Sequence, residues 1–225
     1  MKYKKILLFV IFILIIAIPI SYANTNVSDE IGINNENEPV LMKNSNEYYF
    51  NSSLPNDGDG SKENPYNYLD SSRIQADSTL YFTDGNYELN TNKNIFNVKI
   101  VGQNSEKTII NLKKHTLTTY NFIAENVTLF NGHIQNYYEL NLTNVILDYC
   151  EGTSMDSYSN TYGGAICNIG DTIENPTVNI NKCTFKENIA KYGGAIYSIA
   201  GTVNIEDSVF FHNSADNYGG AIACE

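Results

Sequence analysis

The phrase Tyr162-Gly163-Gly164-Ala165-Ile166 occurs three times in this sequence, returning as Tyr192-Gly193-Gly194-Ala195-Ile196 and as Tyr218-Gly219-Gly220-Ala221-Ile222. The copies are 30 and 26 residues apart, a period typical of proteins built from stacked structural repeats. Other residues recur with the phrase: Val178-Asn179-Ile180 returns as Val203-Asn204-Ile205, and Phe185 and Asn188 return as Phe210 and Asn213. The last two copies differ in length by one residue just before the tyrosine, and we expect this difference to fall in a turn.

Each repeat is too short to bury a core of its own. We expect strands at 194–198, 202–206 and 209–213, separated by bends, and the alternation in Val203-Asn204-Ile205 indicates one buried face. The repeat is rich in Gly, Asn, Thr and β-branched residues, which disfavour helix interiors. Three short strands and three bends make one coil, which buries its inner face only against the coils above and below it. The sequence therefore predicts an all-β fold, a single-stranded parallel β-helix.

The recurring residues have expected structural roles. A bend that repeats at one height of every coil favours residues without a Cβ, and these are Gly163, Gly164, Gly193, Gly194, Gly219 and Gly220. We expect the amides of Asn188 and Asn213 to bond to each other and to turn backbone. Tyr162, Tyr192 and Tyr218 should form a column packed at a corner; the alternative is an aromatic platform that stacks on sugar rings.

The first residues are typical of an export signal. Three lysines precede an apolar run over 6–18, and Ser21-Tyr22-Ala23 follows as a cleavage pattern. Cleavage after Ala23 removes three lysines and no acidic residue, so the net charge changes from -11 to -14. We predict a signal peptide at 1–23, with an uncleaved membrane anchor as the alternative, and a flexible lead-in at 24–47.

Residues 48–94 are expected to form an N-terminal cap and the first coil. A short helix is predicted over 68–76, followed by strands at 78–82 and 87–89. Asp57 and Asp59, with the glycines beside them, are weak candidates for a calcium loop. The remaining ligands of an EF-hand are absent, and Asp-Gly pairs mostly form turns, so a turn is favoured.

Residues 95–225 are expected to form the β-helix itself. Short alternating strands continue from 95 to 149 without the Gly-Gly phrase, which indicates less regular coils of the same stack. The sequence stops at Glu225, a few residues into a strand. Two explanations stay open: a fragment of a longer protein, or self-association through an open C-terminal coil.

Gly-Gly-Ala-Ile combined with Phe-x-x-Asn resembles the repeat of the chlamydial polymorphic outer-membrane proteins. It equally resembles the adhesin-like surface proteins of methanogenic archaea. The motif stands at Phe185 with Asn188 and at Phe210 with Asn213. The resemblance implies a right-handed β-helix plugged at its N-terminal end by the short helix. It also implies a secreted or cell-surface protein, in the outer membrane if the host has one, that serves adhesion.

The cysteines, histidines and glycosylation sequons carry weaker signals. Cys150, Cys167, Cys183 and Cys224 are expected to be small buried or half-buried thiols, with Cys167 beside Cys150 or Cys183 the one pairing worth testing. His115, His133 and His212 are isolated and are expected in turns or at the surface. Sequons stand at Asn26, Asn51, Asn126 and Asn141, and chance matches are frequent in a chain this rich in asparagine.

Two classes of function remain. An acidic chain with a pI near 4.7 and no basic cluster after Lys5 does not suit nucleic acid. The favoured function is an adhesin-like module that binds glycans or other surface components, without catalytic residues, cofactor or firm metal site, and that meets a membrane only through an uncleaved signal peptide. The alternative is a polysaccharide lyase or glycoside hydrolase on the same fold. Against it, the acids after residue 147 do not recur in register, and few basic residues lie near them.

Overall fold

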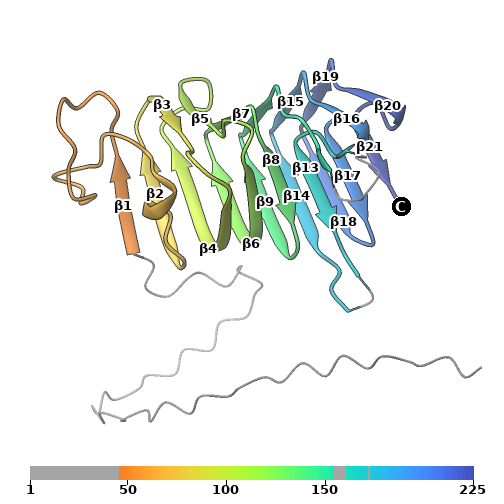
Figure 1. Ribbon diagram of the computed structural model, residues 1–225, viewed down its shortest axis with the longest axis horizontal. Helices are drawn as coiled ribbons and strands as arrows, with labels where there is room; N and C mark the ends of the chain where they lie inside the picture. Colours follow the sequence, from red (N-terminus) through yellow and green to blue (C-terminus); the bar gives the residue numbers. More distant parts are fainter. Residues whose placement is uncertain (1–45, 155–160, 172) are drawn as a thin grey trace, which may run out of the picture. The chain divides into compact units, whose positions relative to one another are not determined.

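The computed structural model describes residues 46–154, 161–171 and 173–225, which belong to one compact unit (Figure 1). The predicted signal peptide and nearly all of the lead-in lie outside the described residues. The elements are β1 (Asn46–Phe50), η1 (Ser71–Arg73), β2 (Ser78–Phe82), β3 (Gly85–Glu88), β4 (Lys93–Gly102), β5 (Thr108–Asn111), β6 (Thr116–Glu125), β7 (Thr128–Phe130), β8 (His133–Asn136), β9 (Glu139–Thr143), β10 (Ile146–Asp148), β11 (Thr153–Ser154), β12 (Thr161–Tyr162), β13 (Ile166–Ile169), β14 (Thr177–Asn181), β15 (Thr184–Lys186), β16 (Ile189–Tyr192), β17 (Ile196–Ile199), β18 (Thr202–Glu206), β19 (Val209–Phe211), β20 (Ser214–Tyr218) and β21 (Ile222–Cys224).

The strands form three sheets in which each coil of chain adds strands beside those of the coil before it (Figure 1). Sheet A contains β1, β2, β4, β6, β8, β9, β13, β14, β17, β18 and β21; sheet B contains β3, β5, β7, β10, β15 and β19; sheet C contains β11, β12, β16 and β20. Apart from the antiparallel pair β11–β12, the paired strands run parallel. The predicted parallel β-helix is confirmed.

The register of the coils follows the sequence repeat. Ile166 pairs with Ile196, and Ile196 pairs with Ile222. The predicted strand over 202–206 is β18, which pairs with β14.

Two expectations about the late coils were wrong. The one-residue length difference is a register irregularity inside the β16–β20 pair, between Ala190 and Tyr192, rather than a turn. Each late coil also has a fourth strand, β16 or β20, that the sequence pattern did not reveal.

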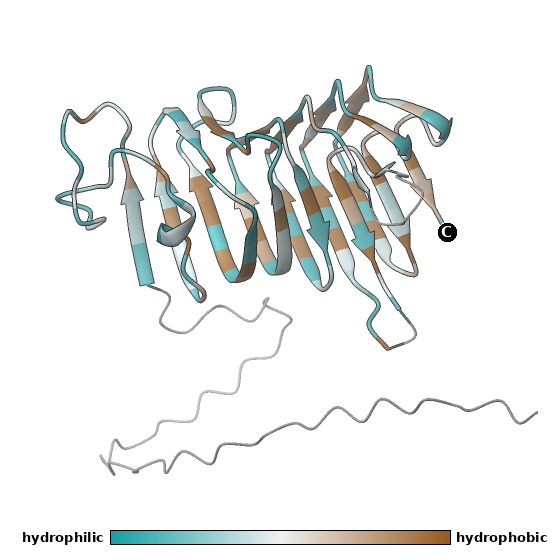
Figure 2. Ribbon diagram, in the orientation of Figure 1, coloured by the Kyte–Doolittle hydropathy of each residue, from teal (hydrophilic) through white to brown (hydrophobic). Residues whose placement is uncertain are grey.

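The core consists of apolar columns that run from coil to coil. Side chains alternate between buried and outward positions along the strands, as in β14, whose Val178 and Ile180 are buried. Figure 2 shows hydrophobic and hydrophilic bands along the same strands. Leu129, Leu147 and Phe185 occupy one register position of sheet B and are fully buried. Each coil therefore supplies one layer of the core. The layers bury apolar surface against one another, and each Å² buried contributes about 25 cal/mol to the stability of the fold.

Asparagine supplies many of the corners. A left-handed backbone recurs after sheet A strands at Asn126, Asn144, Lys182 and Asp207, and after sheet B strands at Asn131, Tyr149, Glu187 and His212. Asparagine and aspartate tolerate positive φ better than most residues. The Asn-rich composition is therefore explained in part by the need to turn at the same height in every coil.

The helix predicted over 68–76 is wrong, since the structure has only the single 3-10 turn η1. Asp70 caps this turn through the backbone N–H of Ser72, and Ile74 is already extended. Arg73 lies over the rings of Tyr66 and Tyr68, 3.9 and 3.8 Å from their centroids. One turn cannot overcome the cost of helix nucleation, so these tertiary contacts decide the local backbone.

Candidate functional site

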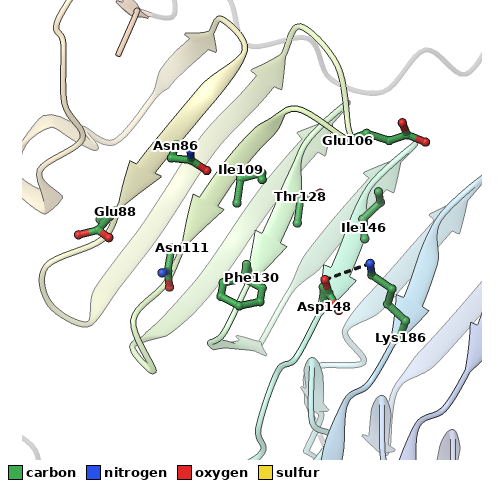
Figure 3. A pocket seen from close by; sticks show the side chains of 10 residues that line it. All are labelled: Asn86, Glu88, Glu106, Ile109, Asn111, Thr128, Phe130, Ile146, Asp148 and Lys186. Carbon is green, nitrogen blue, oxygen red and sulfur yellow. Dashed lines mark ion pairs between the residues drawn. The ribbon is translucent and has the colours of Figure 1, made fainter. Parts of the chain in front are cut away.

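A groove of about 540 Å³ crosses the outward face of sheet B (Figure 3). Its floor is built from two rows of residues that lie in register across the strands. The first row is Asn86, Ile109, Thr128 and Ile146, and the second is Glu88, Asn111, Phe130, Asp148 and Lys186. Side chains two residues apart on a strand point to the same face, so five coils each contribute to one continuous surface.

The centre of the groove is apolar and its second row carries charge. Phe130, Ile109 and Ile146 are half-buried, so part of each remains open to a ligand. Lys186 Nζ lies 3.1 Å from Asp148 Oδ2, and the Asp148 side chain keeps only 13% of its exposure. Asp148 Oδ1 is buried and finds no hydrogen-bond partner within the described part of the chain. A buried carboxylate oxygen without a hydrogen-bond partner is costly.

A loop between β4 and β5 forms one wall. Thr128 Oγ1 donates to the Ser105 carbonyl over 2.6 Å, which holds the loop against the floor. Glu106 follows on this loop and reaches over the groove (Figure 3). A second hollow of about 450 Å³ shares Asn86 and Glu88 with the groove. Together the hollows offer an extended, partly aromatic track with amides, carboxylates, a histidine and two lysines, Lys113 and Lys186. These are groups that can form hydrogen bonds with a polar ligand.

The glycine doublets lie one above another at the corner before sheet A. Gly163, Gly193 and Gly219 have φ of 55°, 62° and 72°, where residues with a Cβ are strained. The second glycine has a different reason: a Cβ on Gly194 would collide with the Gly220 carbonyl oxygen, whereas a Cβ on Gly220 would meet nothing closer than 3.9 Å.

The Phe-x-x-Asn residues also stack. The rings of Phe185 and Phe210 are 4.5 Å apart and nearly parallel. Asn188 Nδ2 donates to Asn213 Oδ1 over 2.8 Å and to the Leu147 carbonyl over 3.1 Å, and Asn188 Oδ1 accepts the Cys150 N–H. Asn188 is fully buried, so its amide satisfies turn backbone that water cannot reach.

The three repeat tyrosines form a column, and much of their surface is covered. Tyr162 and Tyr192 stack with centroids 5.1 Å apart, and Tyr218 meets Tyr192 edge-on at 4.8 Å. Tyr162 and Tyr192 also pack against a small cluster outside the main core that contains Cys167 and Tyr197. Tyr218 is 50% exposed. This geometry favours the packing role over a platform for sugars.

The weak metal candidates are engaged elsewhere. Arg73 Nη1 and Nη2 contact both oxygens of Asp57 at 3.0 and 2.5 Å, and this hydrogen-bonded guanidinium lowers the pKa of Asp57. Asp59 Oδ1 accepts the Ser61 N–H over 2.9 Å in a turn. Across the described ranges, no group of three or more His, Cys, Asp or Glu side chains is placed to hold a metal ion.

The four cysteines form no disulfide, so the pairing of Cys167 with Cys150 or Cys183 is not formed, and of the four only Cys224 is exposed. Burial raises the pKa of Cys150 to about 12. Of the sequons, Asn126 and Asn141 are half-buried and accept bonds from neighbouring asparagines, whereas Asn26 lies outside the described residues.

The expectation for His133 was wrong, since this side chain is 1% exposed. Ile134 pairs with Ile166, so Gly132-His133-Ile134 takes the register of Gly164-Ala165-Ile166. A degenerate copy of the phrase was thus present in the sequence and was missed. Burial lowers the pKa of His133 to about 4.

Sequence reasoning also missed the groove and an interior polar ladder. Thr119, Asn136, Asn168 and Ser198 are buried in successive coils and bond along the stack at 2.8 to 3.1 Å. The spacing of Asn136, Asn168 and Ser198 near the repeat period was the available signal. The sequence carried no corresponding signal for the groove, because the groove residues come from coils of unequal length.

The Chlamydia polymorphic membrane protein repeat matches residues 182–199 and 207–225. Each matched segment contains one strand of sheet B, one of sheet C and one of sheet A. The predicted resemblance to the chlamydial repeat is confirmed, and the match supports a surface or outer-membrane protein. No curated protein and no solved structure matches the chain. Within the part of the chain that the structure describes, no helix has the length and apolar character needed to span a bilayer.

Proposed function

We propose that this protein is an exported, adhesin-like surface protein that binds a glycan along the outward face of sheet B. The groove across five coils carries the proposal, because a continuous track with an aromatic centre and polar edges suits an extended sugar chain better than a compact metabolite. The repeat match supports the surface location. The stacked layers supply a rigid scaffold, which lowers the entropic cost of ordering the site on binding.

Two groove variants and one matched control test this function. A glycan array would identify the best oligosaccharide, and calorimetry would then measure its Kd. We expect Phe130→Ala to raise Kd at least about 10-fold, because an aromatic contact at a desolvated centre contributes more than about 1 kcal/mol. Lys186→Gln should raise Kd several-fold. Lys99→Gln removes a similar ion pair, Lys99 Nζ to Glu125 Oε1 at 2.8 Å, on sheet A and should leave Kd unchanged. Equal affinity in all three variants would place the glycan elsewhere.

The Asp148–Lys186 pair also favours testing the enzymatic alternative. A carboxylate and a lysine 3.1 Å apart in a groove are residue types that acid–base chemistry uses. Incubation with polygalacturonate and other uronic polymers, with and without Ca²⁺, would reveal a lyase through the absorbance of unsaturated products. Product formation that Lys186→Gln abolishes would replace the binding function by a catalytic one.

We also propose that copies of this protein associate with one another. Among the described strands, β18, β19, β20 and β21 each have a neighbour on one side only. Val209 and Phe211 on the same coil are 56% and 41% exposed. Unpaired strand edges beside apolar side chains favour pairing with another chain. Sedimentation of the protein across a concentration series would show oligomers if this edge pairs and a monomer if it does not.

A further inference from the structure

A third hollow, of about 290 Å³, lies beside sheet A rather than sheet B. Its lining includes the rings of Tyr120, Tyr137 and Tyr138, the side chain of Ile169, and the acidic residues Asp171 and Glu174. No lysine, arginine or histidine belongs to this lining within the described residues. Its volume is near the lower end of the range of about 300–1,000 Å³ for small-molecule sites, so it suits a compact group rather than an oligosaccharide.

The tyrosines are held in place and remain accessible. Tyr120 stacks between Phe96 and Tyr137, with centroids 4.8 and 5.6 Å apart and interplanar angles of 7° and 14°. Gln135 Nε2 donates to the Tyr137 hydroxyl over 2.7 Å. Tyr120 and Tyr138 are 36% and 49% exposed. This stack covers both faces of Tyr120, so the rings that can present a face to a ligand are Tyr137, on the side away from Tyr120, and Tyr138.

Two carboxylates add negative charge to the lining of the hollow. Asp171 Oδ1 accepts the backbone N–H groups of Ile173 and Glu174 over 2.7 and 2.8 Å, and these bonds lower the pKa of Asp171. The turn keeps this carboxylate ionised and near Glu174. Aromatic rings attract cations through their negative faces, and recognition of quaternary ammonium groups by clustered rings is a recurrent use of that attraction.

We propose that this hollow binds an alkylated ammonium group, such as the trimethylammonium of choline. Tyr137 and Tyr138 contribute the aromatic faces, Tyr120 supports the ring of Tyr137 from behind, and Asp171 and Glu174 contribute the charge. The proposal does not depend on glycan binding at sheet B, since the two sites share no residue.

Calorimetry with choline and its neutral isostere 3,3-dimethylbutan-1-ol tests the charge requirement on the full chain. We expect choline to bind at least about 10-fold more tightly than the alcohol, and its affinity to fall as salt is raised. Equal binding of the two compounds, or no binding of choline at millimolar concentration, would overturn the proposal. Binding of glucose in place of choline would assign the hollow to a sugar and would also overturn it.

Variants then locate the site. Tyr138→Ala should weaken choline binding about 10-fold and Glu174→Gln several-fold. Tyr149→Asn changes another exposed tyrosine, outside this lining, and should have no effect. Asparagine is chosen there because Tyr149 has a φ of 51°. Circular dichroism would verify that each variant is folded. Unchanged affinity in folded Tyr138→Ala would contradict the assignment. Phosphatidylcholine vesicles tested beside soluble choline would separate a lipid headgroup from a free ligand.

Discussion

The early and late coils share one core, but the chain returns from sheet B to sheet A differently in each. The chain returns from sheet B to sheet A through four residues between β5 and β6, and through two between β7 and β8. It uses nine residues between β15 and β17, and ten between β19 and β21, and these longer returns contain the strands of sheet C. The early coils are therefore closed by two sheets, whereas the late coils have three.

This difference explains what the repeated phrase marks. The third corner, where the chain leaves sheet C for sheet A, holds the glycine doublets and the tyrosine column. The shorter connection between β7 and β8 has a single glycine, Gly132, in place of the doublet. It places His133 where the later coils have alanine. The Tyr-Gly-Gly-Ala-Ile phrase is thus a signature of the third sheet, and the β-helix itself begins well before it.

The largest expected effect comes from the second glycine of the third corner. Gly194→Val should destabilise the protein by at least about 3 kcal/mol, since its side chain would overlap the Gly220 carbonyl oxygen. Gly220→Val is the matched control in the next coil and should cost less than about 1 kcal/mol, because the space there is open. Thermal melts of both variants would measure this. Equal melting temperatures would show that the doublets do not pack coil on coil.

The corner between sheets B and C should give the next largest effect. Asn188→Ala should cost about 2–3 kcal/mol, because it leaves the buried Cys150 N–H and Leu147 carbonyl without their amide partner. Asn213→Ala, at the half-buried position one coil later, should cost about 1 kcal/mol. Urea denaturation of the two variants gives both values. The reverse ranking would contradict the assigned burial.

His133 provides a pH test of the early coil. Its folded pKa of about 4 lies below the ordinary value of 6.5, so the unfolded chain takes up the proton first as the pH falls. The stability of the protein should be fully present above about pH 6.5 and should fall by about 2 kcal/mol by pH 5. In His133→Leu this loss should disappear, while losses due to other groups remain. Parallel pH profiles of wild type and variant would mean that His133 is not buried in its neutral form.

The sequence predicted the features that repeat at a constant period. The register of Ile166, Ile196 and Ile222, and the strand β18, follow from the period and the alternation of apolar residues. The strands β16 and β20 were missed because Ser214–Tyr218 lacks clean alternation, and a bulge interrupts its pairing. The helix over 68–76 was a local prediction that the contacts of Arg73 overrode.

The candidate site could not be predicted from the sequence, and the reason is geometric. Asp148 and Lys186 face each other because β10 and β15 pair, yet a long coil separates them in the chain. The coil between Phe130 and Asp148 is much shorter. No single period therefore aligns the residues of the groove. Only the pairing of the strands, which depends on how each coil is closed, brings them to one face.

The stacking of coils across the change in perimeter is tested most directly by a distance between spin labels. Asn141 and Asn204 lie two coils apart on sheet A, each in register with Asn179. Nitroxides would be attached at Asn141→Cys and Asn204→Cys, with the exposed Cys224 replaced by serine. The backbones of the two labelled positions should lie about 10 Å apart, which is twice the spacing between neighbouring strands. Continuous-wave EPR should show strong dipolar broadening relative to the sum of the singly labelled spectra. Spectra that superimpose on that sum would contradict the stacked coils.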